Sequence, residues 1–380
     1  MAIQTVDWLA REALLILQSN MVATQLYDRQ YEADFSGSEA RGDTIRVRRR
    51  DRGNAQEFGG AINPRGLQES KIDIVLEKHY DASFEITSKE AKLDLDSFSD
   101  QVVEPEVVSI AELVDAFALS KINDLPNMAG VDGAGAPLAF ATDIGGVAQY
   151  RKVLNNLKVP MAGRQAIWSP EGDAKLLSIA SFVEANKKGD NGTALAEASL
   201  GRVLGFDHWM AQNVDETPLA SLDGASAQVV GALPVGTTAI PVDTANGAAV
   251  VFADRSTVQI GGINYTVNGA ATMAGSAGTI NILEGLKAPA ADNDVVSTPY
   301  AKSDNFVPRG AIFVPRAFAF VSVPLDIPPG AEAAVITNNG YSIRVVRDYD
   351  ITSKKTIVSF DCLVGSRVVH GELGAKVVEA

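Results

Sequence analysis

The three histidines are the residues best suited to acid–base or metal chemistry, but their spacing supports neither. His79, His208 and His370 lie far apart and form no HxxxH or HxH pair. Asp207 could orient His208 as a general base, but no nucleophile or second histidine stands in register with it. We therefore expect His208 to be an ordinary strand histidine. The single cysteine, Cys362, excludes an internal disulfide and a cysteine-rich zinc site.

Two loop patterns approach known functional motifs without completing them. Residues 274–278 come close to the GxSxG nucleophile motif, but β-prone residues follow where that motif opens a helix. Residues 94–100 begin like a calcium loop, yet they lack its glycine and Pro105 replaces its bidentate glutamate. The sequence also contains no GxxxxGK[ST] or GxGxxG phosphate loop. We therefore predict no catalytic residues, no cofactor and no metal site, and hence a protein that is not an enzyme.

Basic residues concentrate between residues 41 and 52 of a chain that is acidic as a whole. The chain has 47 Asp and Glu against 33 Lys and Arg, a net charge of −14. No aromatic residues alternate with these arginines to stack on bases, and the acidic excess repels a polyanion at longer range. Guanidinium groups also pair bidentately with carboxylates. We therefore favour contacts with the acidic surface of an identical neighbour over nucleic-acid binding. The candidate subunit-interface residues are Arg46, Arg48, Arg49, Arg50 and Arg52.

A long extended hairpin is expected to carry these arginines. Polar and apolar residues alternate over 44–48 and again over 71–86, with a glycine-rich stretch between them. Because too few apolar residues occur in this region to build a core, we expect the hairpin to pack on a neighbouring chain. Its candidate hinges are Gly53, Gly59, Gly60 and Gly66.

Two amphipathic helices flank the hairpin. The first follows Thr5, a possible cap, and belongs to an N-terminal arm that we also expect to need a neighbour. Its apolar residues are Val6, Leu9, Ala13, Ile16 and Leu17. The second helix runs from Pro105 to Asp124, about 30 Å. Its apolar face consists of Val107, Ile110, Val114 and Phe117, widened by Leu113 and Ala118. Further helices are expected over 146–157 and after Ser169-Pro170, followed by a strand over 206–210.

The composition changes after residue 220. Only two basic and six acidic residues occur between Ala220 and Tyr300, and five short β-prone runs are separated by Gly, Asn and Asp. These runs are 239–242, 250–252, 257–260, 264–267 and 279–283. They predict a small β-barrel or sandwich inserted over 221–303. Its uncharged stretch 256–283 is broken by glycines and does not read as a membrane span.

The last part of the chain is expected to be rich in strands. These are predicted over 317–323, 333–337, 341–348, 356–363 and 367–369. With 46% hydrophobic residues, the chain can also bury a sizeable core. The predicted divisions are 1–35 (arm), 36–95 (hairpin), 96–220 (first part of the core), 221–303 (insertion) and 304–380 (strand-rich end).

This order of elements resembles the major capsid proteins of tailed bacteriophages, with the Hong Kong-type capsid fold. The stretch 71–88 is similar to the return strand of that family's extension loop, and the helix 105–124 to its spine helix. Residues 205–214, 338–350 and 363–373 resemble its later strands. The insertion is similar to the extra β-domain of the short-tailed Salmonella-phage coat subgroup, although smaller. The resemblance covers essentially the whole chain.

The resemblance implies an α+β fold with a peripheral and an axial domain, and a structural role. Such subunits form hexamers and pentamers of an icosahedral virion shell around double-stranded DNA, with weak, non-specific contact to that DNA. They assemble in the bacterial cytoplasm, usually with a scaffolding protein and a portal, and in some phages with a decoration protein. They have no membrane partner. Some relatives crosslink subunits through a Lys–Asn bond, which we do not predict here. The alternative is a β-rich virion decoration, tail or glycan-binding protein.

Overall fold

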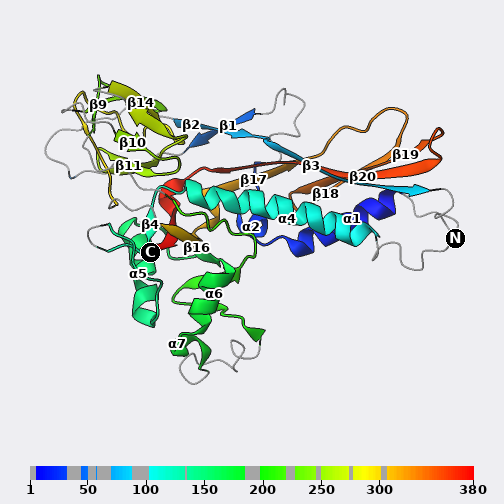
Figure 1. Ribbon diagram of the computed structural model, residues 1–380, viewed down its shortest axis with the longest axis horizontal. Helices are drawn as coiled ribbons and strands as arrows, with labels where there is room; N and C mark the ends of the chain where they lie inside the picture. Colours follow the sequence, from blue (N-terminus) through cyan, green and yellow to red (C-terminus); the bar gives the residue numbers. More distant parts are fainter. Residues whose placement is uncertain are drawn as a thin grey trace. The chain divides into compact units, whose positions relative to one another are not determined.

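The computed structural model describes residues 6–31, 44–49, 57, 70–87, 102–132, 135–184, 197–219, 227–244, 250–273, 277–300 and 306–380 (Figure 1). Within them the chain forms two compact units, each built from separate stretches of sequence. Unit 1 comprises Met1–Ile45, Ile74–Lys121 and Phe318–Arg367, and unit 2 comprises Arg46–Asp73, Ile122–Ala317 and Val368–Ala380.

Unit 1 is organised by a five-stranded sheet in the order β17-β20-β19-β18, with β3 also pairing with β20. The strands are β3 (Lys78–Thr87), β17 (Phe318–Val323), β18 (Glu332–Asn338), β19 (Tyr341–Asp350) and β20 (Lys355–Val368). The turn between β18 and β19 consists of Asn339 and Gly340, both with positive φ. This is the backbone that a two-residue hairpin turn requires, and Asn and Gly tolerate it best.

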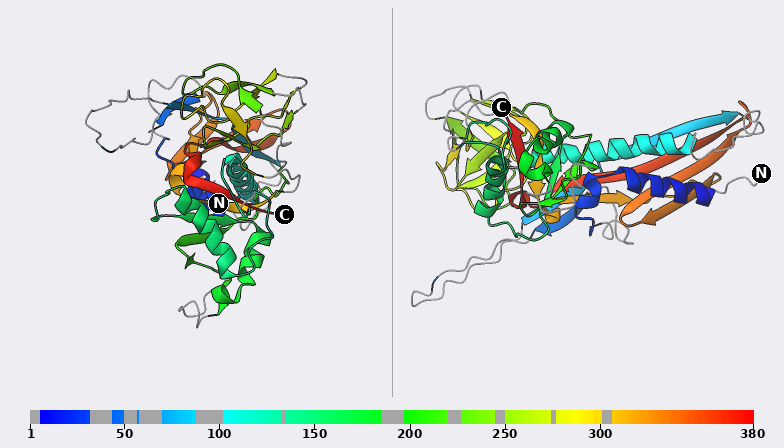
Figure 2. Two further views of the ribbon diagram at one scale, coloured as in Figure 1. Left: turned by 90° about the vertical axis from the view of Figure 1, so that its left-hand side faces the viewer. Right: turned by 90° about the horizontal axis from the view of Figure 1, so that it is seen from below.

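Helices α1 (Val6–Asn20) and α4 (Glu104–Ser120) pack on each other, and α1 also packs on β18 and β19 (Figure 2). Between them, α2 (Ala23–Leu26) is tied to α4 by Asp115, whose Oδ1 accepts hydrogen bonds from the N–H groups of Val22 (3.2 Å) and Ala23 (2.9 Å). Burial raises the pKa of Asp115, although these two hydrogen bonds act in the opposite direction.

The predicted helices are present, with two corrections. Val107, Ile110, Val114 and Phe117 are buried as expected, but Leu113 is 50% exposed and does not widen that face. The N-terminal arm was expected to bury its apolar residues only against a neighbouring chain, and this expectation is wrong for α1. Six of its apolar residues face the helix and sheet of unit 1, because they fall at helical spacing. They are Val6, Leu9, Ala10, Ala13, Leu14 and Leu17.

The predicted return strand over 71–86 is two strands. β2 (Ser70–Val75) pairs with β1 (Thr44–Arg49), whereas β3 joins the sheet of unit 1 as a partner of β20. The break occurs beside Gly365, where a Cβ would lie 2.4 Å from the carbonyl oxygen of Val75. Only the part of the hairpin that precedes this break remains a separate two-stranded ribbon.

In unit 2, a six-stranded sheet has the order β4-β21-β16-β5-β7-β6. Its strands are β4 (Met128–Ala129), β5 (Gln165–Trp168), β6 (Arg202–Val203), β7 (Phe206–Met210), β16 (Val307–Phe313) and β21 (Gly374–Glu379). The helices are α5 (Ile144–Asn156), α6 (Pro170–Leu177) and α7 (Ala180–Val183). Ser169 caps α6 as predicted, because its Oγ accepts from the N–H of Gly172 at 3.2 Å.

Residues 227–297 form a second β-structure within unit 2. A six-stranded sheet has the order β12-β11-β15-β8-β9-β14, and β10 pairs with β13. The strands are β8 (Ala227–Val229), β9 (Ala239–Thr244), β10 (Val250–Phe252), β11 (Thr257–Ile260), β12 (Ile263–Thr266), β13 (Ala271–Met273), β14 (Ala277–Asn281) and β15 (Val295–Ser297). All five predicted β-runs are strands here. Their buried side chains form a hydrophobic cluster of their own.

Polar contacts join this β-structure to the rest of unit 2. Asn264 Nδ2 donates to Asn127 Oδ1 at 3.1 Å, and Lys287 Nζ donates to Glu372 Oε2 at 3.0 Å. The buried ammonium of Lys376 belongs to the same contact region. Its Nζ lies 3.0 Å from the carbonyl oxygen of Asn123 and 3.2 Å from that of Arg255. Burial lowers the pKa of Lys376 from 10.5 to about 7.

We expect Lys376 to make stability depend on pH. Between about 7 and 10.5 the unfolded chain holds a proton on this lysine that the folded chain lacks, so the free energy of unfolding rises with pH. The rise is at most about 1.4 kcal/mol per pH unit. It should disappear in Lys376→Met and persist in Lys152→Met, an exposed position on α5. Urea unfolding from about pH 7 to 8.5 measures it, with every variant compared in a Cys362→Ala background. That background is needed because a free thiol ionises near pH 8.5 in the unfolded chain, whereas burial keeps the thiol of the folded chain protonated. An unchanged pH slope in Lys376→Met would contradict a neutral buried lysine.

Candidate functional site

The basic hairpin is the candidate site that the sequence analysis favoured. Arg46 lies on β1 with its side chain 73% exposed, and its Nε is 3.3 Å from Asp73 Oδ1 on the paired strand β2. Water screens such an exposed pair, so it contributes less than about 1 kcal/mol to stability. Arg46 therefore remains available to a partner.

The other hairpin candidates are only partly placed. Arg48 and Arg49 belong to β1, but the positions of their side chains are outside the described residues. Arg50, Arg52 and all four candidate hinges, Gly53, Gly59, Gly60 and Gly66, also lie outside the described ranges. Their roles remain predictions.

His208 has a packing role in unit 2. Trp168 Nε1 donates to His208 Nδ1 at 2.9 Å, and the two rings stack with centroids 6.0 Å apart. His208 Nε2 is 3.3 Å from the carbonyl oxygen of Val203. Since Nδ1 accepts and Nε2 faces an acceptor, the ring is fixed as one neutral tautomer. The neighbouring Asp207 lies 3.8 Å from Arg202 Nε.

The remaining sequence candidates also lack reactive surroundings. Cys362 is buried, and burial raises the pKa of its thiol to about 12. Residues 94–100 and 274–276 are outside the described ranges. Where the structure describes the chain, no three potential metal ligands lie together, and no helix is long and apolar enough to cross a membrane.

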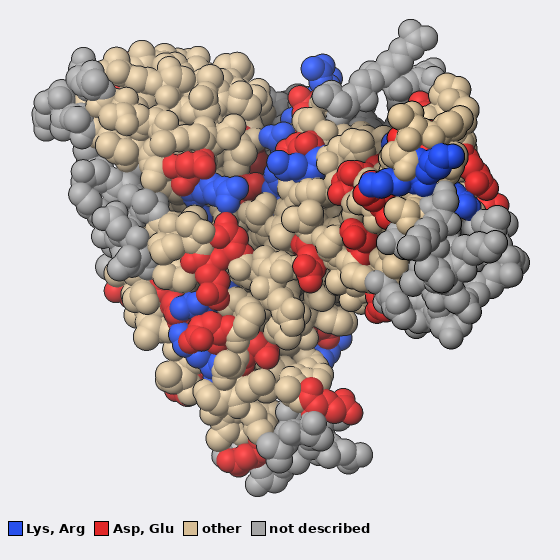
Figure 3. Space-filling view, turned by 45° about the vertical axis from the view of Figure 1, so that its right-hand side comes forward, with Lys and Arg blue, Asp and Glu red and all other residues tan. Residues whose placement is uncertain are grey.

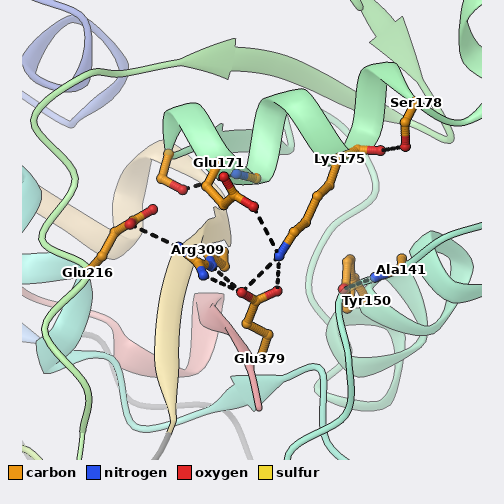
Figure 4. Close-up of polar contacts among 10 residues, drawn as sticks. Ala141, Tyr150, Glu171, Lys175, Ser178, Glu216, Arg309 and Glu379 are labelled. Carbon is orange, nitrogen blue, oxygen red and sulfur yellow. Dashed lines mark hydrogen bonds and ion pairs between the residues drawn. The ribbon is translucent and has the colours of Figure 1, made fainter.

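A buried charge cluster that the sequence analysis did not find surrounds Glu379 on β21 (Figure 4). Glu379 accepts from Arg309 Nε on β16 at 2.5 Å and from Lys175 Nζ on α6 at 2.8 Å. Each cation has a second carboxylate: Glu216 Oε2 lies 2.8 Å from Arg309, and Glu171 Oε1 lies 3.4 Å from Lys175.

The cluster ties the C-terminal strand to α6 and β16. Burial lowers the pKa of Arg309, but its hydrogen bonds to Glu379 and Glu216 outweigh that effect, and the net pKa is raised. Burial also raises the pKa of the nearby Tyr150 to about 12, and the charge of Glu379 adds to that rise. Both carboxylate oxygens of Glu379 are paired, so removing this carboxylate would leave two partly buried cations without the charge that they share.

Charges are mixed on the molecular face drawn in Figure 3. There, basic and acidic side chains of the described residues lie beside one another. A nucleic-acid-binding face would instead gather Lys and Arg into a continuous patch or stripe. The charge pattern on this face therefore favours ion pairs over phosphate binding.

We expect Glu379→Gln to destabilise the unassembled chain by about 3 kcal/mol, because it removes the charge shared by two partly buried cations. Glu171→Gln is the matched control, since it changes the other carboxylate of the same Lys175. Glu171 is 52% exposed, and its loss should cost less than about 1 kcal/mol. Urea unfolding of both variants measures the difference. Equal effects of the two substitutions would show that Glu379 does not organise the cluster.

No protein-family model and no curated protein matches the sequence. Among solved structures, the chain is similar to one from Mycobacterium phage Che8, at 14% identity and a TM-score of 0.51, covering 94% of this chain and 90% of that one. Two weaker likenesses are to phage capsid structures. The capsid structure of Cyanophage P-SCSP1u gives 11% identity, 90% and 84% coverage and a TM-score of 0.46. The mature capsid of bacteriophage PhiM1 gives 10% identity, 90% and 83% coverage and 0.47.

A likeness at this level of identity shows the fold alone. The match to the Che8 chain covers nearly the whole of both chains. It therefore confirms the α+β fold that the resemblance to phage capsid proteins implied.

Proposed function

We propose that this chain is the major capsid protein of a tailed bacteriophage. In this role it forms hexamers and pentamers of an icosahedral shell that encloses double-stranded DNA, after assembly in the host cytoplasm. The observation that carries the proposal is the fold shared with the Che8 chain over 94% of this chain. The order of elements that suggested the family from the sequence is independent support.

Exposed apolar side chains at one end of the sheet of unit 1 also support self-association. Ile351, in the turn between β19 and β20, is 80% exposed, and Tyr349 and Ile357 beside it are 48% and 43% exposed. Clusters of large apolar side chains exposed to solvent are typical of surfaces that another protein covers. In a shell, this end of the β19–β20 hairpin would be covered by a neighbouring subunit.

The finer assignments rest on the resemblance. We assign the hairpin arginines to contacts between subunits. We assign the four hairpin glycines to hinges that let the hairpin bend differently in subunits at quasi-equivalent positions of the shell. A scaffolding protein, a portal and a decoration protein are the proposed partners. With a net charge of −14, contact with the enclosed DNA should be weak and non-specific. No enzymatic step is proposed.

The β-structure over 227–297 is proposed to be an inserted domain within 221–303. Its separate hydrophobic cluster supports this division, whereas Asn127, Glu372 and Lys376 make the polar contacts that attach it to the rest of unit 2. The same feature favours the alternative function, a β-rich virion decoration, tail or glycan-binding protein. That alternative does not account for the pairing of β3 with β20 or for the long helix α4.

Assembly is the decisive test of the capsid function. We expect shells or capsomers in negative-stain micrographs of the protein expressed alone or together with the products of its neighbouring genes. The reason is that two exposed parts of the chain would be covered only by a neighbouring subunit. These parts are the arginine-bearing hairpin that contains β1 and β2, and the exposed end of the β19–β20 hairpin. Monomers or trimers under every condition would argue for the decoration or tail function instead.

The hairpin arginines should be needed for assembly and not for folding. We expect Arg48, Arg49 and Arg50, replaced together by Ser, to block shell formation with a nearly unchanged melting temperature of the monomer. Arg202→Ser, which removes an exposed arginine outside the hairpin, is the control and should assemble normally. Micrographs and the DNA content of purified particles measure the outcome. Normal shells that fail only to retain DNA would assign these arginines to nucleic acid.

A further inference from the structure

β18 is an edge strand with unused backbone groups. It ends the strand order of the unit 1 sheet, and β19 is the one strand paired with it in the described part of the chain. Asn338 and Tyr341 flank the two-residue turn, so they form a hydrogen-bonded pair, and such pairs alternate along the ladder. Ala333, Val335 and Thr337 therefore direct their N–H and C=O groups away from β19.

A groove of about 560 Å³ runs along this edge. α1 contributes Arg11, Leu14 and Leu15 to its lining, and β18 contributes residues 335–338. Successive side chains of a strand point to opposite faces of the sheet. Four consecutive residues can line one groove only if the groove follows the edge of the strand. The unpaired backbone of β18 thus faces a cavity walled by α1.

The lining also has a defined chemistry. Leu15 is 61% exposed and, with Leu14, gives the groove an apolar wall. Arg11 is the one charged side chain that lines it, and it makes no ion pair with any residue in the described ranges. A ligand for this groove would combine free backbone hydrogen-bonding groups, apolar side chains and a carboxylate.

We propose that the groove binds an extended segment of a partner polypeptide, in which an acidic side chain alternates with apolar ones. The segment adds to β18 as a strand, its carboxylate meets Arg11, and its apolar side chains cover the exposed Leu15. An extended ligand is required because a helix would leave the outward N–H and C=O groups of β18 unpaired.

A different polypeptide fits this description better than a second copy. In the described part of the chain, acidic–apolar stretches such as Ile72-Asp73-Ile74 and Phe84-Glu85-Ile86 already pair with strands of their own chain, β1 and β20. A second copy would have to open one of these pairings to offer such a stretch. The proposal concerns unit 1 alone and does not depend on shell formation.

Selection from a display library of random linear peptides on the full-length chain tests the proposal. We expect enriched peptides to alternate Asp or Glu with apolar residues. Fluorescence anisotropy should show at least about fivefold weaker binding of these peptides to Arg11→Glu, because the charge contact is reversed. Lys152→Glu on α5 is the matched charge-reversal control and should bind normally. Enrichment of basic peptides, or equal binding by both variants, would overturn the proposal.

Strand addition has a separate test with the same peptides. Val335→Pro removes an N–H group that faces the groove without removing a hydrogen bond to β19, and should weaken binding about fivefold. Ala333→Pro removes an outward N–H group beyond the groove lining and should have little effect. Circular dichroism confirms that each variant is folded. Equal binding by the two proline variants would exclude strand addition. Sedimentation that shows wild-type self-association lost in Arg11→Glu, without any selected peptide competing, would make the occupant a second copy.

Discussion

Backbone pairing along β20 is the constraint on which unit 1 depends. This strand has 14 residues, most of them buried, and its N–H and C=O groups must find partners because buried backbone groups are almost never left unpaired. β19 pairs with one edge, β3 with the other, and β17 is a further partner. The hairpin strand is divided for this reason: β3 completes the sheet, and the chain turns where Gly365 leaves room for the carbonyl of Val75.

Unit 2 has to accommodate two charged residues on one buried strand. All six residues of β21 are buried, including Lys376 and Glu379. Glu379 keeps its charge because Arg309 and Lys175 supply the opposite one. Lys376 has carbonyl oxygens as its hydrogen-bond acceptors, and burial shifts its pKa towards the neutral form. The same strand therefore shows both physical solutions to a buried charge: pairing and neutralisation.

Three surface features of the folded chain are available for contact with other chains. The β1–β2 ribbon carries an exposed Arg46, the β19–β20 hairpin ends in exposed apolar side chains, and β18 has an open edge. The open edge and the exposed apolar side chains are unfavourable in an isolated chain, because both promote association. These are the surfaces on which the proposed self-association and the proposed peptide binding rest.

The elements that could be predicted from the sequence are those with local signals. Helical spacing identified α1 and α4, and Ser169-Pro170 identified the start of α6. Alternation identified β1, and short β-prone runs between turn residues identified five strands of the β-structure. The sequence did not reveal β16, where Pro308 and Gly310 obscure the pattern, or β21, where Lys376 and Glu379 do. It also misplaced Leu113, because periodicity says which residues share a face and not how wide the covering element is.

The pairing of strands and the pairing of buried charges could not be predicted from the sequence, because both depend on contacts between distant segments. The cluster around Glu379 draws on residues from 171 to 379, and the division of the hairpin depends on Gly365, far along the chain. The spacing of apolar residues along one helix or strand indicates which of its side chains are buried. The partners of buried backbone groups and buried charges are supplied by distant segments, so they are fixed only when the chain has folded.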